Sequence, residues 1–440
     1  MKKLFKIFSE KLFDYLLQDE VLKMTFSGES SQFIRINSAK IRQTGYVDDA
    51  DVSLTLIFNN RNCSRSFTYT DDPDKNLKTA LSVLSEMRGE INHLPEDKYI
   101  VEPKSSGSTE EIIHCSLLTH DEVIDSLLPV MQGVDLVGIW ASGRIFRGSA
   151  NSLGLNHWFE TDSFSLDYSL VTPQHQMVKG TFSGRDWDQN KYEEFLSTSK
   201  KKVELLNRKP VKIKPGSYRV WFEPAAVGDF IGMFSWNGLS EASIQQGCSG
   251  FGKMRKNSEL LSPKFTLKED FSSGRVPRFN SEGEIAPETM TLIAGGKLQN
   301  TLVSSRTSAE YGVDSNMAEN GEYLRSPKMK SGSLPEVDIL PTIDNGLFIS
   351  NIHYLNWSDN PSGRITGLTR YACFQVEGGE VTAPIDTMRF DDTFYRFFGS
   401  ELEAVGQKMD IIPDVSTYYR RSIEVMSCPG ILVNSFALTL

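Results

Sequence analysis

Residues 345–389 read NGLFISNIHYLNWSDNPSGRITGLTRYACFQVEGGEVTAPIDTMR. The first part, around Leu347 and Ile349, is rich in β-branched and aromatic residues, as strands are. A cluster of Asp, Asn, Pro, Ser and Gly at 358–363 then predicts a turn. Gly378-Gly379 separates two further extended runs and is typical of a tight hairpin turn. The stretch therefore predicts an antiparallel β-meander.

The order of residues in this meander is more specific than its periodicity. It resembles the C-terminal domain of the TldD/PmbA (TldD/TldE) family, the "modulator of DNA gyrase" peptidase family. In that domain a strand, a D-x-x-x-G-x-x-x-G turn and an E-x-G hairpin follow one another. The matching positions are Asp359, Gly363, Gly367, Glu377, Gly379 and Pro384. The resemblance covers most of the chain and is densest over residues 216–390.

Length and charge restrict the class of protein. The chain has 440 residues, and about 150 residues per domain gives two or three domains. A formal net charge of -10 disfavours a nucleic-acid-binding protein, because phosphate contacts need a basic face. The sequence contains no apolar run that approaches the ~18 residues of a membrane span. We therefore expect neither nucleic acid nor membrane as a partner.

The cellular location follows from the N-terminus and the cysteines. Residues 1–24 place apolar side chains at helical spacing but interrupt them with charges. This pattern predicts a helix packed on its own domain rather than a signal peptide. The five cysteines are far apart and form no CxxC, which indicates unpaired thiols in a reducing compartment. A cytoplasmic location is expected.

The predicted fold class is α+β. The resemblance implies two duplicated α/β lobes, at 1–103 and 104–212, followed by a β-rich, mainly antiparallel domain of the TldD/PmbA type at 213–440. From the residues, the first lobe is predicted to be α-β-β-α, and its last helix begins near Asp72-Pro73.

Other elements are predicted from local composition and periodicity. In the second lobe they are a polar linker at 102–112, a helix at 121–131, a strand pair at 135–147, strands at 164–171 and 177–183, and a helix at 192–206. In the C-terminal domain they are a strand at 218–222, a helix opened by Pro224, short helices at 241–246, 304–310 and 394–404, and a long exposed loop at 313–336.

The resemblance is most informative where a motif is missing. One branch of the family carries HExxxH on the first helix of the C-terminal domain, where two His residues bind zinc and the Glu is the general base. Counting back from Ser249, which opens a phrase similar to one in the family, places the ligand positions on Gly232 and Asn237 and the base position on Met233. Glycine has no side chain to donate, and methionine cannot accept a proton. Cys428 stands near the family's third ligand but too late in the sequence to match it.

These positions identify the chain with the PmbA/TldE-like branch, which lacks HExxxH. The resemblance implies no catalytic residue, no metal ligand and no cofactor in this chain. It implies a non-catalytic subunit that forms a heterodimer with a TldD-like zinc metallopeptidase and helps to bind and proteolyse unfolded peptides, with the zinc in the partner. We expect the peptide or partner face at Trp236, Asn237, Cys248 and Ser249.

Two other functions stay open. The chain could form a homodimeric peptide-binding or scaffold protein without a peptidase partner. Direct modulation of a DNA topoisomerase, suggested by the family's older name, is disfavoured by the acidic net charge.

Overall fold

The N-terminal half of the chain is built on one seven-stranded sheet. The computed structural model describes residues 1–105 and 107–439. The strand order is β3-β2-β1-β5-β6-β4, and β7 also pairs with β6. The strands are β1 (Val21–Asn37), β2 (Lys40–Phe58), β3 (Arg61–Tyr69), β4 (Ser108–Ile113), β5 (Asp135–Asn151), β6 (Asn156–Val171) and β7 (Met177–Gly184). The two predicted lobes share this sheet, because β1 of the first pairs with β5 of the second from Lys23–Asn151 to Ile36–Gly138.

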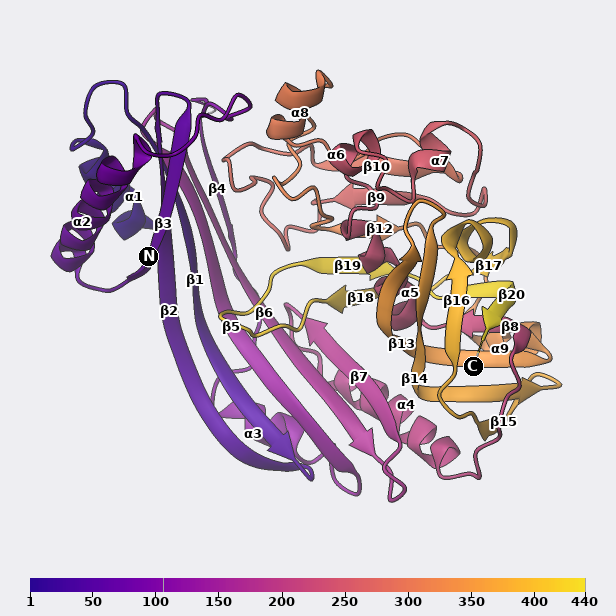
Figure 1. The fold of residues 1–440 in the computed structure, drawn as a ribbon. Helices are drawn as coiled ribbons and strands as arrows, with labels where there is room; N and C mark the ends of the chain where they lie inside the picture. Colours follow the sequence, from indigo (N-terminus) through magenta and orange to yellow (C-terminus); the bar gives the residue numbers. More distant parts are fainter. Residues whose placement is uncertain (106, 440) are drawn as a thin grey trace.

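Helices cover the two ends of one face of this sheet (Figure 1). Side chains alternate between the faces of a strand, and even-numbered residues of β5 and β6 face the helices. Phe146 and Trp158 lie in the core under α1 (Lys2–Phe13) and α2 (Pro73–Ile91). Trp140 and Leu166 lie in a second core, under α3 (Glu122–Leu127) and α4 (Gln189–Leu206). The middle of the face, between the two helix pairs, is polar.

Two predictions for this half need correction. The first lobe is α-β-β-β-α, because the polar edge strand β3 lacks an apolar run that would mark it. The predicted strand pair at 135–147 is the single strand β5. Gly143, within β5, allows close contact with β1: a Cβ there would lie 2.2 Å from the Ser30 carbonyl oxygen.

The predicted linker at 102–112 contains strand β4 from Ser108 onward, and its residue 106 lies outside the described residues. The strands predicted at 164–171 and 177–183 and the helix at 192–206 are confirmed as parts of β6, β7 and α4. The helix predicted at 121–131 is the shorter α3. The predicted start of the helix near Asp72 is also confirmed, since Asp72 caps α2.

The C-terminal half contains two further sheets. One has the order β11-β10-β9-β12-β19-β18, and the other β13-β8-β20-β16-β14-β15 with β17 beside β20. Their strands are β8 (Gly216–Phe222), β9 (Leu267–Asp270), β10 (Thr289–Ala294), β11 (Lys297–Leu298), β12 (Pro327–Met329), β13 (Gly346–Asp359), β14 (Arg364–Glu377), β15 (Glu380–Pro384), β16 (Arg389–Thr393), β17 (Leu402–Val405), β18 (Asp410–Pro413), β19 (Val425–Cys428) and β20 (Ile431–Leu438). The short helices are α5 (Pro224–Gly232), η1 (Met233–Ser235), α6 (Glu241–Gln245), α7 (Gly252–Arg255), α8 (Ser305–Tyr311), η2 (Glu336–Asp338), α9 (Ile339–Ile343) and η3 (Arg396–Ser400).

The β-meander is confirmed. β13, β14 and β15 are consecutive antiparallel strands. Gly378 and Gly379 make the second turn with φ of 59° and 77°, values that glycine adopts without strain. The α+β fold class is confirmed with them.

Two C-terminal predictions are wrong. The segment at 313–336 is not an exposed loop, since Leu324, Arg325 and Met329 are buried and β12 lies within it. Its polar residues are bonded inside the domain; Arg325, for example, donates to the Phe279 carbonyl oxygen at 2.9 Å. The helix predicted at 394–404 is the single turn η3 followed by strand β17. Among the described residues, every helix is too short or too polar to cross a membrane.

Candidate functional site

The positions where the family resemblance places its metal motif begin at the last residue of α5 and run on through η1 into the turn after it. β8 ends at Phe222, and Pro224 occupies the first turn of α5, where its missing N–H costs nothing. The apolar face of α5 is buried in the main core of the domain; it consists of Ala226, Val227, Phe230 and Ile231. The helix is therefore held rigidly between the sheets.

The three motif positions do not offer a zinc site. Gly232 is the last residue of α5 and has no side chain. Met233 is 3% exposed and packs in the main core. Asn237 lies in a turn with φ of 59°, and its amide is a poorer zinc ligand than the imidazole or thiolate that the metal prefers. These donors do not fit the family's zinc ion, and we derive no reaction step through it.

The four residues of the predicted peptide face lie in two neighbouring turns with different environments. Trp236 is 58% exposed, and its carbonyl oxygen accepts a hydrogen bond from the Trp357 indole at 2.9 Å. Cys248 is exposed, with its thiol 3.7 Å from the Gln246 carbonyl oxygen. Trp236 and Cys248 are thus accessible to a ligand.

Ser249 is instead a buried structural residue. Its hydroxyl donates to the Gly238 carbonyl oxygen and accepts from the backbone N–H of Phe251. These bonds join the turn after η1 to the turn before α7. Because both are internal, the Ser249 hydroxyl contributes to the shape of the face rather than to a contact with a ligand.

The first turn of the β-meander lies beside these residues. A Cβ on Gly250 would lie 3.0 Å from the Asn360 carbonyl oxygen, and Gly363 is also adjacent. The Tyr395 hydroxyl donates to the Gly250 carbonyl oxygen at 2.7 Å. Asp359 accepts a hydrogen bond from the Ser362 N–H, and bonds to Ser362 lower the pKa of Asp359. The family-like turn and the predicted face therefore form one surface.

Sequence reasoning missed the acidic side of α5. Asp229 precedes Gly232 by three residues, so both lie on the same side of the helix. Solvent reaches the Asp229 side chain, yet partial desolvation raises its pKa to about 7. The Cys428 thiol donates to the Pro224 carbonyl oxygen at 3.2 Å, and burial raises the pKa of that thiol. Asp229 lies three residues before Gly232, and this i, i+3 spacing on one side of a helix could have identified it from the sequence.

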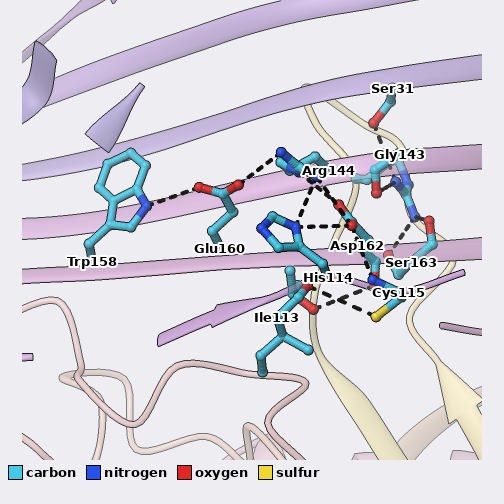
Figure 2. Close-up of polar contacts among 12 residues, drawn as sticks. Ser31, Ile113, His114, Cys115, Gly143, Arg144, Trp158, Glu160, Asp162 and Ser163 are labelled. Atoms are coloured by element: carbon cyan, nitrogen blue, oxygen red, sulfur yellow. Dashed lines mark hydrogen bonds and ion pairs between the residues drawn. The ribbon is translucent and has the colours of Figure 1, made fainter. Parts of the chain in front are cut away.

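A second polar cluster lies on the helix-bearing face of the N-terminal sheet, between the two helix pairs. Figure 2 shows Arg144 between Glu160, Asp162 and His114. Its guanidinium lies 3.1 Å from the Glu160 carboxylate and 2.8 Å from that of Asp162. A third contact joins the guanidinium to His114 Nδ1 at 3.0 Å; arginine is the donor in it, since a guanidinium only donates. The Trp158 indole donates to Glu160 at 3.3 Å. The charged groups of the cluster therefore have their hydrogen-bond and ion-pair partners within it.

One junction between the two halves of the chain lies on the opposite face of this sheet, in addition to the packing of α4 against β14 and β15. The segment 414–424, between β18 and β19, reaches the sheet (Figure 1). The Arg421 guanidinium is 5% exposed and donates to the Gly143 carbonyl oxygen at 3.3 Å and to that of Ser163 at 2.9 Å. Arg420 donates to Asp51 at 2.6 Å. We call this segment the clasp.

Within residues 1–105 and 107–439, no three His, Cys, Asp or Glu side chains are grouped so that they could hold a metal ion. The absence of a zinc ion from this chain stays a prediction.

The comparisons with known proteins agree with the fold. Residues 215–439 match the model of the PmbA/TldA metallopeptidase C-terminal domain. TldE from Thermococcus kodakarensis superposes with a TM-score of 0.74 at 17% identity, over 100% of this chain and 99% of that one. A protein called a modulator of DNA gyrase from Thermotoga maritima gives 0.76 at 16% identity, over 99% and 100%. Another so called, from Bacteroides thetaiotaomicron, gives 0.76 at 15% identity, over 100% and 98%. No curated protein matches the sequence. At these identities the structural likeness shows the fold alone.

Proposed function

Because the chain belongs to the PmbA/TldD metallopeptidase family, we propose that it is a TldE-like subunit without a catalytic centre of its own. In this proposal it pairs with a TldD-like chain that carries HExxxH and a zinc ion. The pair binds unfolded peptides and cleaves them in the cytoplasm.

One observation carries the proposal. The segment on which the family resemblance places a metal motif, from the end of α5 to the turn after η1, has Gly232, Met233 and Asn237 at the motif positions. The Met233 side chain is part of the core, so a buried apolar residue occupies the position of the general base. A protein fold can keep its architecture while its catalytic groups are lost, since function depends on the site and not on the fold.

The accessible groups near α5 suit the binding of a peptide. Trp236 offers an exposed aromatic surface, and aromatic side chains are enriched at binding interfaces. Asp229, with a pKa near neutrality, can accept or donate a hydrogen bond to a peptide amide. Main-chain pairing with an exposed strand edge would bind peptides of many sequences.

The direct test is reconstitution with a homologue that carries HExxxH. We expect the two chains to co-elute in size-exclusion chromatography and to cleave an unfolded protein such as denatured casein only together. Trp236→Ala is expected to lower the rate of cleavage by about tenfold, the loss of roughly 1.4 kcal/mol of binding. Tyr354→Ala, which removes a similarly exposed ring from β13, is the matched control.

The outcomes separate this function from its alternatives. A stable homodimer that binds peptides but does not associate with any HExxxH homologue would favour the homodimeric scaffold. Inhibition of DNA gyrase by the isolated chain would favour the activity named for the relatives from Thermotoga and Bacteroides. Unchanged cleavage with Trp236→Ala would show that the predicted face is not where the peptide binds.

A further inference from the structure

A cavity of about 50 Å³ lies where the clasp meets the edge of the N-terminal sheet. Its floor is formed by β6 and β7, with the hydroxyls of Ser163, Ser165 and Ser183. The clasp forms one wall. Since a water needs about 10–15 Å³ on the same scale, the cavity has room for a few waters or for one small polar group.

Three arginines line this cavity, Arg185, Arg275 and Arg421. The Arg421 guanidinium donates to oxygens of Ser31, Gly143 and Ser163, and the charges of Glu29 and Asp162 partly offset its own. Arg185 has a single long bond of 3.5 Å, to the Gly274 carbonyl oxygen. Within residues 1–105 and 107–439, the Arg275 side chain has neither a hydrogen bond nor an ion pair. Partly buried arginines are normally paired, so Arg185 and Arg275 lack the anion that such a site calls for.

The carboxylates of the cavity wall do not fill this role. Asp414 accepts from the Ser416 N–H at 2.9 Å, and Glu424 accepts from the Ser422 hydroxyl, so both bind within the clasp itself. Asp186, whose charge acts on Arg275 from outside the wall, accepts a hydrogen bond from the Ser116 N–H at 2.9 Å. Burial is the main cause that lowers the pKa of Arg275; the Arg185 charge lowers it further, while Cys115 and Asp186 act in the opposite direction.

The charges of the residues that line the cavity suit a ligand with a single negative charge. Among the residues that line the cavity alone, three arginines stand against two carboxylates, Asp414 and Glu424, while Asp186 and Glu29 lie beyond the lining. A guanidinium binds a carboxylate through two parallel N–H···O bonds. A carboxylate carries one negative charge, whereas a phosphate carries close to two.

We propose that this cavity binds the C-terminal carboxylate of an extended peptide, with Arg185 and Arg275 as the groups that hold it. The inference rests on the proposed function as a peptide-binding subunit and adds a preference for one end of the peptide. Peptides would then be held with a defined direction relative to α5.

The test is binding of three fluorescent, N-acetylated peptides of one unstructured sequence to the full chain, measured by anisotropy. The first ends in a free carboxylate, the second in an amide, and the third in an amide with one internal glutamate. We expect the free acid to bind at least about tenfold more tightly than either amide, since charge-assisted hydrogen bonds contribute about 1.5–3 kcal/mol. Arg275→Gln and Arg185→Gln should abolish that preference while leaving the melting temperature unchanged.

A matched control is Arg42→Gln, which removes an exposed arginine on β2 far in sequence from the cavity. This variant should keep the preference for the free acid over the amides. Equal binding of acid and amide would overturn the carboxylate site and leave peptide binding intact. Tight binding of the internal-glutamate amide would overturn the assignment to the C-terminus.

Competition distinguishes the ligand from a free anion. Displacement of the peptide by inorganic phosphate at concentrations where acetate has no effect would assign the cavity to phosphate and overturn the proposal. If no peptide binds while cleavage with the HExxxH partner persists, the carboxylate site is wrong but the proposed function stands. If peptide binding and partner-dependent cleavage are both absent, the carboxylate site and the proposed function are both wrong.

Discussion

At the scale of the residue, Glu269 is the buried acid whose ionisation the fold opposes most clearly. It is 3% exposed, and burial raises its pKa from 4.5 to about 7. The backbone N–H groups of Arg325 and Ser326 donate to its carboxylate, and the Arg325 charge also favours ionisation, but these effects only partly offset the desolvation.

The stability of the protein should therefore depend on Glu269 in a defined pH window. Between about pH 4.5 and 7 the folded chain holds a proton that the unfolded chain has released, so stability falls as the pH rises. Relative to Glu269→Gln, we expect the wild-type free energy of unfolding to decrease by about 2–3 kcal/mol between about pH 5 and pH 8. Urea unfolding of both proteins at each pH measures this decrease. A difference in unfolding free energy between the two proteins that does not vary with pH would refute the raised pKa of Glu269.

Single residues also show how far the sequence predicts the site. Trp236 and Cys248 are exposed, as a binding face requires, although no binding has been tested. Ser249 was chosen by its place in a family phrase, and its internal bonds depend on Gly238, eleven residues away, which periodicity cannot reveal. Asp229 was missed because a lone acid on an apolar helix resembles an ordinary surface residue.

At the scale of the element, local signals predicted those elements that local chemistry determines. Asp72 accepts from the backbone N–H groups of Asp74 and Lys75 at 3.0 Å, the arrangement that its place before Pro73 predicts. Edge strand β3 was missed because its polar residues give no apolar run, although it forms a tight hairpin with β2. Edge strand β4 was missed because it pairs with β6, which is distant in sequence. The buried segment around Leu324 was mistaken for a loop because its polar side chains find partners only in the folded domain.

The cap gives a prediction at this scale. Asp72→Ala should lower the free energy of unfolding by about 1 kcal/mol, because two N–H groups of α2 lose their acceptor. Asp71→Ala, which removes the neighbouring exposed acid with no cap bond, should change it by less than about 0.5 kcal/mol. Chemical denaturation of the two variants measures both. Equal effects would mean that net charge rather than capping determines the result.

At the scale of the whole molecule, the clasp connects the two halves. The joint sheet pairs Lys23 with Asn151, and Arg421 reaches Gly143 across a still larger sequence separation. Neither relation leaves a periodic signal in the sequence. The resemblance to the family predicted the β-rich domain and the duplicated units but not the way in which they join.

Removal of the clasp's buried arginine should loosen this junction. Arg421→Met leaves the carbonyl oxygens of Gly143 and Ser163 without that donor, a cost of about 2–4 kcal/mol. We expect faster proteolytic cleavage within 414–424 and faster amide exchange in β5. Tyr419→Ala changes an 87% exposed side chain of the same segment and should alter neither rate. Protection equal to that of the wild type in Arg421→Met would show that the clasp does not hold the halves together.

The central claim is that this chain depends on a partner for catalysis, and metal content with activity tests it most directly. The isolated chain, purified without chelators and given zinc, should retain far less than one zinc ion per molecule and leave denatured casein intact, whereas cleavage should begin when an HExxxH homologue is added. One tightly held zinc ion per chain, together with hydrolysis by the chain alone, would contradict the account.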